Sequence, residues 1–271
     1  MSEVIQPYRF LSALSLDVVA GALACSLFFS RIFSVALRPP ELIALGLSVW
    51  IIYTADHLRD SRNIQQRAST ERHQFHQLHY RTLFAVMSVM VILDAIAILF
   101  IPRQVLIWGI VLSAAVFVYL FTHRLLRFLK EVFIATLYAS GIVLPSLAVS
   151  TIEINEVHYL LIFHFTVLAL TNLLMFSWFD RDVDLRDSRH SFATIAGESV
   201  TRIAIWFLCG IQILTTLVEL RIGYYTSAAI LLCIMGLLLT VIFIFRKSLA
   251  PHEYYRFLGD AVFIVPVLYL I

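Results

Sequence analysis

The chain has 271 residues, of which 61% are hydrophobic and only 14% are charged. Soluble domains carry roughly 25% charged residues, so this composition argues against a water-soluble globular protein. The formal net charge of +2 gives no reason to expect a nucleic-acid partner. The charged residues are grouped between long apolar runs, which predicts an all-α, polytopic membrane protein embedded in the lipid bilayer.

A membrane-spanning helix needs about 20 mostly apolar residues. By this criterion we expect about nine spans, near residues 10–33, 41–58, 80–101, 104–122, 131–150, 157–179, 202–220, 224–245 and 254–271. Pro145 and Pro266 fall inside two of these spans and are expected to kink them. No linker or low-complexity segment separates the spans, so residues 1–271 are predicted to form a single integral-membrane domain.

The basic residues predict how the chain is oriented in the membrane. Most of the 20 lysines and arginines fall in the connections after the second, fourth, sixth and eighth spans. Because such residues are enriched in cytoplasmic loops, the N-terminus is expected in the cytoplasm and the C-terminus outside. In a bacterium the membrane would be the inner (plasma) membrane.

Two acidic clusters follow predicted spans on this cytoplasmic side. "YTADHLRDSRN", at 53–63, follows the second span, and "SWFDRDVDLRDSRH", at 177–190, follows the sixth. Residues four apart lie on the same face of a helix, so Asp56 and Asp60 share one face. Asp180 and Asp184 are spaced in the same way.

Like charges on one face repel each other unless a cation lies between them. Mg²⁺ is suited to this position, because it takes oxygen ligands and is usually held by one or two carboxylates together with substrate phosphates. Two such clusters predict two metal ions that clamp a diphosphate, with nearby basic side chains neutralising the remaining charge. The candidates for that contact are Arg59, Arg62, Lys130, Arg181 and Arg189. The alternative is that these charges are the ordinary polar ends of membrane helices.

With these two motifs, after the second and the sixth span, the chain resembles the UbiA superfamily of intramembrane prenyltransferases. In that family the first motif reads Asn-Asp-x-x-Asp-x-x-x-Asp and the second centres on Asp-x-x-x-Asp. "FDRDVDLRD" is similar to the second motif, and "RFLKE", which contains Lys130, is similar to a basic patch of the family. The first motif departs from the pattern, because Ile52 and Tyr53 stand where Asn and Asp are expected.

The resemblance implies a helical bundle around a central cavity that opens near the cytoplasmic face. It further implies Mg²⁺-dependent transfer of a prenyl group from an isoprenoid diphosphate to a lipophilic, often aromatic acceptor. Asp56, Asp60, Asp180 and Asp184 would then be the catalytic metal ligands. Tyr53, Tyr119 and Asn172 are candidates for the cavity wall, although Asn172 is equally suited to a hydrogen bond between helices.

The stretch "ERHQFHQLH" places His73, His76 and His79 three residues apart. This spacing is compatible with a transition-metal site. It is also typical of an amphipathic segment that lies on the membrane surface and covers a pocket as a lid.

Three other functions remain open on the sequence alone. An isoprenoid cyclase would use the same ionisation step as a prenyltransferase. A non-catalytic relative would bind a lipid, a pigment or a prenyl compound, or act as a subunit scaffold. A transporter would also carry intramembrane carboxylates, but the charges here gather at one face rather than at the midplane.

Overall fold

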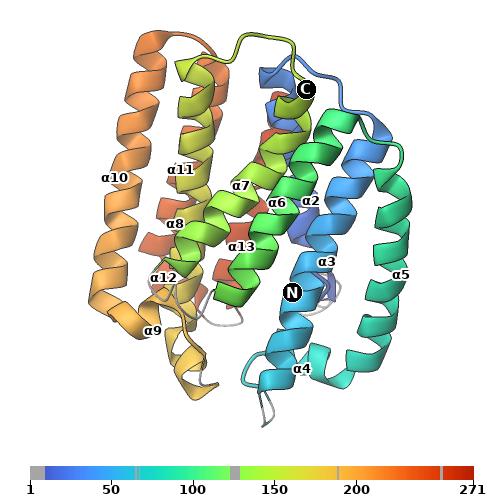
Figure 1. Cartoon of the computed structure of the whole chain (residues 1–271). Coiled ribbons are helices and arrows are strands. Elements are labelled where there is room, and N and C mark those ends of the chain that lie inside the picture. The colour runs from blue at the N-terminus through green and yellow to red at the C-terminus, as the bar shows by residue number, and fades with distance from the viewer. Residues whose placement is uncertain (1–9, 65, 67, 123–128, 188, 251–252) are drawn as a thin grey trace.

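The computed structural model describes residues 10–64, 66, 68–122, 129–187, 189–250 and 253–271 (Figure 1). The long helices are α2 (Leu16–Ile32), α3 (Pro39–Asn63), α5 (Tyr80–Ile98), α6 (Arg103–Thr122), α7 (Lys130–Val149), α8 (Glu156–Arg186), α10 (Glu198–Ile222) and α11 (Thr226–Ile244). The short ones are α4 (Glu71–Leu78), α9 (Phe192–Ala196), α12 (Arg246–Leu249), α13 (Tyr254–Val262) and the 3-10 helix η2 (Val265–Tyr269). The described residues contain no strand, so the predicted all-α fold class is confirmed.

Six of these helices are long and apolar enough to cross a membrane: α3, α5, α7, α8, α10 and α11. Helix α2 has only 17 residues, and the predicted count of nine spans is not confirmed. The outer surface of the bundle is apolar, as Ile92 on α5 (61% exposed) and Phe207 on α10 (67% exposed) illustrate. Large apolar side chains in such numbers on the outside face lipid, so the chain is an integral membrane protein.

Helices α3 and α8 end at the same end of the bundle, where α4 and α9 also lie, and the C-terminus lies at the opposite end (Figure 1). Both helices continue beyond the predicted spans 41–58 and 157–179. A helix satisfies its own backbone hydrogen bonds, so it does not have to end where the side chains become polar. Both aspartate pairs therefore lie on the last turns of helices, as the spacing argument requires.

The segment predicted as a ninth span, 254–271, is not one continuous helix. Helix α13 ends before η2 begins, and Pro266 lies in the first turn of η2, where it lacks the N–H needed to continue an α-helix. Gly259 allows α13 to approach α8 closely, because a Cβ at this position would lie 2.6 Å from Asn172 Oδ1. The end of the chain therefore passes through the bundle as two short helices packed against α2 and α11, toward the C-terminus at the opposite end (Figure 1).

A buried polar pair links α8 to α10 within the apolar bundle. His164 Nδ1 lies 2.9 Å from Glu219 Oε2 and donates a hydrogen bond to it, and neither side chain is exposed. On the same helices, Gln212 Nε2 donates to Thr171 Oγ1 at 2.7 Å. Polar groups in an apolar medium are costly unless they are paired, so these bonds fix how α10 packs on α8.

We expect Glu219→Ala to lower the free energy of unfolding by about 1–3 kcal/mol, because it leaves the His164 imidazole buried without its acceptor. Glu219→Gln should cost less, since the amide oxygen still accepts a hydrogen bond. Unfolding of the purified protein in mixed micelles measures both effects. Glu198→Ala, at an exposed position of the same helix, is the control. Equal stability of Glu219→Ala and Glu198→Ala would contradict the role of the pair.

Candidate functional site

Arg189 connects the two aspartate motifs. Its Nη2 donates a short hydrogen bond to Asp60 Oδ2 on α3, and its Nη1 lies 3.8 Å from Asp184 Oδ1 on α8. The guanidinium group is planar and permanently charged, so it can serve two carboxylates at once. Residues that are more than a hundred positions apart in the sequence therefore meet at one end of the bundle.

The chain after α8 is held so that Arg189 points into this space. The backbone N–H of Arg189 donates to the Asp184 carbonyl oxygen at 2.7 Å. Three residues later, the N–H of Phe192 donates to Oε1 of the buried Glu131 on α7, also at 2.7 Å. These two bonds fix the turn between α8 and α9, and with it the position of the Arg189 side chain.

Asp180 is bound by side chains from α13. The Tyr255 hydroxyl donates a short hydrogen bond to Oδ1, and Arg256 Nη2 donates to Oδ2 at 2.5 Å. The Tyr255 ring stacks on Phe179 with centroids 4.0 Å apart. Both oxygens of Asp180 therefore have donors. Asp56, in contrast, is exposed and forms no ion pair within the described part of the chain.

These groups surround a cavity of about 150 Å³, the outer cavity. Four of its lining residues are basic and four are acidic: Arg72, Lys130, Arg189 and Arg256 against Glu131, Asp180, Asp184 and Glu253. They come from α4, α7, α8, α13 and the connections next to them. An arrangement of this kind binds a charged group that carries several oxygen atoms.

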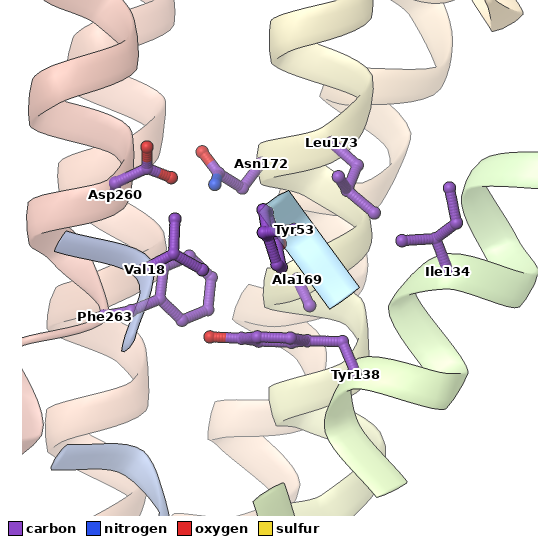
Figure 2. A pocket seen from close by; sticks show the side chains of 9 residues that line it. All are labelled: Val18, Tyr53, Ile134, Tyr138, Ala169, Asn172, Leu173, Asp260 and Phe263. Atoms are coloured by element: carbon purple, nitrogen blue, oxygen red, sulfur yellow. The ribbon is translucent and has the colours of Figure 1, made fainter. Parts of the chain in front are cut away.

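A smaller cavity of about 30 Å³, the inner chamber, lies deeper in the bundle (Figure 2). Ile134 and Leu173 line both cavities, so the two are neighbours. The inner chamber is lined by aromatic and aliphatic side chains and by one polar pair, Asn172 and Asp260, whose side chains point toward one another (Figure 2). At ~10–15 Å³ per water it has room for about two water molecules.

The histidines form a cluster, but not the one predicted. His79 is exposed, and His57 from α3 lies beside His76 instead, with ring centroids 5.0 Å apart. His73 accepts a hydrogen bond from Arg189 Nη1 at Nε2 (3.2 Å), and its Nδ1 donates to Thr70 Oγ1 (2.6 Å). Both His73 nitrogens are therefore engaged, and His73 helps to hold Arg189 in place. Arg72 and His73 of helix α4 also line the outer cavity.

The predicted site residues fall into two groups. Lys130, Asp180, Asp184 and Arg189 line the outer cavity, Tyr53 and Asn172 line the inner chamber, and Asp60 contacts Arg189. Neither cavity is lined by Asp56, Arg59, Arg62, Tyr119 or Arg181. The sequence analysis did not identify Arg72, Arg256, His57 or Asp260 as site residues. A signal was present for Asp260, because it is the one acidic residue in the mostly apolar segment 254–271.

The aspartates suit Mg²⁺ in their chemistry, and two of them, Asp60 and Asp184, approach the same group from two helix ends. A cation, the Arg189 guanidinium, already lies between two of them. Among the described residues, however, no three His, Cys, Asp or Glu side chains lie close enough to hold a metal ion together. The ligand types fit Mg²⁺, but the carboxylates are spaced around a guanidinium group.

The pairing of His73 makes stability depend on pH. This residue lies outside the membrane-spanning helices, and its burial, together with the nearby Arg189 and Arg256, lowers its pKa well below the usual 6.5. The unfolded chain takes up a proton below that value and the folded protein does not. We therefore expect the free energy of unfolding to fall by about 1 kcal/mol between pH 7.5 and 5.5 because of this histidine.

Thermal unfolding in detergent at the two pH values measures this effect. His73→Gln should flatten the dependence, whereas His79→Gln, at an exposed position, should leave it as in the wild type. If both variants respond to pH alike, His73 is not the group responsible.

Comparison with known proteins supports the fold but gives no sequence match. No protein-family model and no curated protein sequence matches the chain. A UbiA homologue from Archaeoglobus fulgidus, solved with DMAPP and Mg²⁺, is 13% identical, with a TM-score of 0.67 over 97% of this chain and 98% of that one. The apo structure of a UbiA homologue from Aeropyrum pernix K1 is 12% identical, with a TM-score of 0.69 over 95% and 99%. The chain therefore has the fold of the UbiA homologues, and the resemblance inferred from its aspartate motifs is confirmed at the level of fold.

Proposed function

We propose that the whole chain is a divergent UbiA-type prenyltransferase, which transfers a prenyl group from an isoprenoid diphosphate to a lipophilic, electron-rich aromatic acceptor. The observation that supports this proposal most directly is the junction of the two cavities. The outer cavity is lined by charged groups, and the inner chamber beside it is lined by aromatic rings. The site faces the cytoplasm, as the distribution of basic residues predicts.

The outer cavity would bind the diphosphate as the leaving group. When the bond between the allylic carbon and the diphosphate oxygen breaks, its electron pair stays with the diphosphate. Arg72, Lys130, Arg189 and Arg256 are positioned to stabilise the charge that develops there. The charge is best stabilised when these groups are already in place, and Arg72 is fixed by a hydrogen bond from Nη2 to the Ser12 carbonyl oxygen at 2.8 Å.

The inner chamber would take the allylic carbocation and the acceptor. Tyr53 and Tyr138 line it, and aromatic faces attract a cation. Most of its walls are apolar, which limits the water that could quench the cation. The acceptor carbon forms the new bond to the prenyl group and then loses a proton. The Asp260 carboxylate lies in the chamber wall and can accept that proton.

Mg²⁺ is the cofactor that the resemblance implies, and the homologue from Archaeoglobus fulgidus was solved with it. In this chain Asp56, Asp60, Asp180 and Asp184 would hold it. When bound, it supplies positive charge that helps the diphosphate to leave. Tyr53, at the position where the family motif has an aspartate, faces the inner chamber and therefore contributes to the cavity wall rather than to a metal site.

The size of the inner chamber favours a second candidate, a non-catalytic protein that binds a lipid or prenyl compound. About 30 Å³ is much less than the ≈300–1,000 Å³ of ordinary ligand pockets, so the side chains of the chamber have to move before a prenyl tail can enter. A chamber that does not open in this way would support binding at the outer cavity without transfer.

The test is release of diphosphate from a labelled donor. We expect purified wild-type protein with Mg²⁺ and a membrane lipid extract to release diphosphate from at least one donor of five to twenty carbons and to move the label into an apolar product. A cyclase would form the apolar product without any added acceptor. Absence of release with every donor would refute the enzyme proposal.

Asp184→Asn should reduce the rate at least a hundredfold, because it removes a carboxylate from the outer cavity while preserving the shape of the side chain. Asp182→Asn is the matched control. Asp182 lies two residues away on the same helix, but its side chain is 83% exposed and contacts Arg181 instead of the cavity. Equal loss of activity in both variants would indicate a general effect on α8 rather than a site role for Asp184.

A further inference from the structure

Arg189 occupies the place between the two motifs where a metal ion would be expected. Its guanidinium group contacts Asp60 and Asp184, and its Nη1 donates a hydrogen bond to His73 Nε2. The Arg189 side chain is 29% exposed and lines the outer cavity, so part of it is accessible to solvent. A divalent cation bound to the same two carboxylates would need the position that the guanidinium group now holds.

The charges of the outer cavity are balanced without any ligand. Its lining contains four lysine or arginine side chains and four carboxylates. A diphosphate brings several negative charges into a partly buried space, and burying charge without compensation is costly. The anion is therefore expected to enter together with added positive charge. If that charge binds to the aspartates, it releases guanidinium groups that can turn to the anion.

Several buried polar atoms of residues in the same lining form no hydrogen bond with the described residues, although Arg256 Nε lies 3.7 Å from Glu253 Oε2. Arg72 Nε and Arg256 Nε are buried and form no hydrogen bond with the described residues, and neither do the two ring nitrogens of His57. The His57 side chain is more than nine-tenths buried. Buried polar groups are nearly always satisfied in native proteins, so these atoms are available to whatever fills the cavity, water or an oxygen-rich anion.

We propose that the Arg189 guanidinium is a resident counter-ion of Asp60 and Asp184, which a divalent cation displaces and which then binds the diphosphate that arrives with the cation. The second half of this proposal, the contact between Arg189 and diphosphate, rests on the proposed function. Its first half, the competition between Arg189 and a divalent cation, concerns only the carboxylates and the guanidinium group. In this way a substrate-free protein offsets the repulsion between the two carboxylates, and metal and anion bind cooperatively.

Mn²⁺ is a suitable probe, because its free concentration can be followed by electron paramagnetic resonance in detergent solution. For the wild type we expect weak binding of Mn²⁺ alone and at least tenfold tighter binding when inorganic diphosphate is present, after correction for Mn²⁺ held by diphosphate in solution. Arg189→Ala should bind Mn²⁺ alone at least tenfold more tightly than the wild type, because its carboxylates have lost their counter-ion. The same variant should lose most of the coupling to diphosphate.

Arg186→Ala is the matched control, because Arg186 is an exposed arginine three residues away whose Nε donates to the Asp182 carbonyl oxygen. It should behave as the wild type does. Asp60→Asn combined with Arg189→Ala should abolish the gained affinity, which would locate the ion at this carboxylate. Arg189→Gln, with a similar stem and no charge, repeats the test if the alanine variant is unstable.

Unchanged affinity of both Arg189 variants for Mn²⁺ alone would overturn the proposal, even if the wild type turned over a prenyl donor. Tighter Mn²⁺ binding by these variants, in a protein that does not respond to diphosphate at all, would support the competition but refute the contact with diphosphate and with it the proposed function.

Discussion

Carboxylates from two helix ends repel each other when they share one small, partly buried space, and positive charge between them is required to hold the helices together. Arg189 supplies this charge for Asp60 on α3 and Asp184 on α8. Arg256 supplies it for Asp180 and links the last part of the chain to α8. The outer cavity exists because these guanidinium groups hold the helix ends around an opening instead of letting them separate.

The same constraint explains how the end of the chain is used. The last segment packs inside the bundle, where Gly259 lets α13 approach α8 closely, and α13 carries three polar side chains with it. Tyr255 and Arg256 reach Asp180 in the outer cavity, and Asp260 reaches the inner chamber beside Asn172. One short helix therefore supplies groups to both cavities, and its polar residues avoid lipid because they are paired inside the protein.

The helices and the two motifs could be predicted from the sequence because each depends on local pattern. Apolar runs mark where the chain lies in the membrane, and a spacing of four residues marks a shared helix face. The same runs do not report where a helix ends, so α3 and α8 are longer than predicted and the segment 254–271 is broken. The partners of the aspartates depend on how distant segments meet. His57 and Arg72 join the outer cavity only because α4 folds against α3, and no motif indicates this contact.

The identity of the cation between the motifs decides between the two candidate functions. With Arg189 in place, one positive charge offsets the repulsion between Asp60 and Asp184. A protein that only binds a lipid has no need to exchange that guanidinium group for a metal ion. An enzyme that expels diphosphate has to make this exchange. A single guanidinium charge that is shared between two carboxylates has little positive charge left to stabilise a leaving group. Arg72 and Arg256, whose buried Nε atoms form no hydrogen bond with the described residues, line the same cavity and would serve an incoming anion under either function, so the exchange at Arg189 is what separates the two.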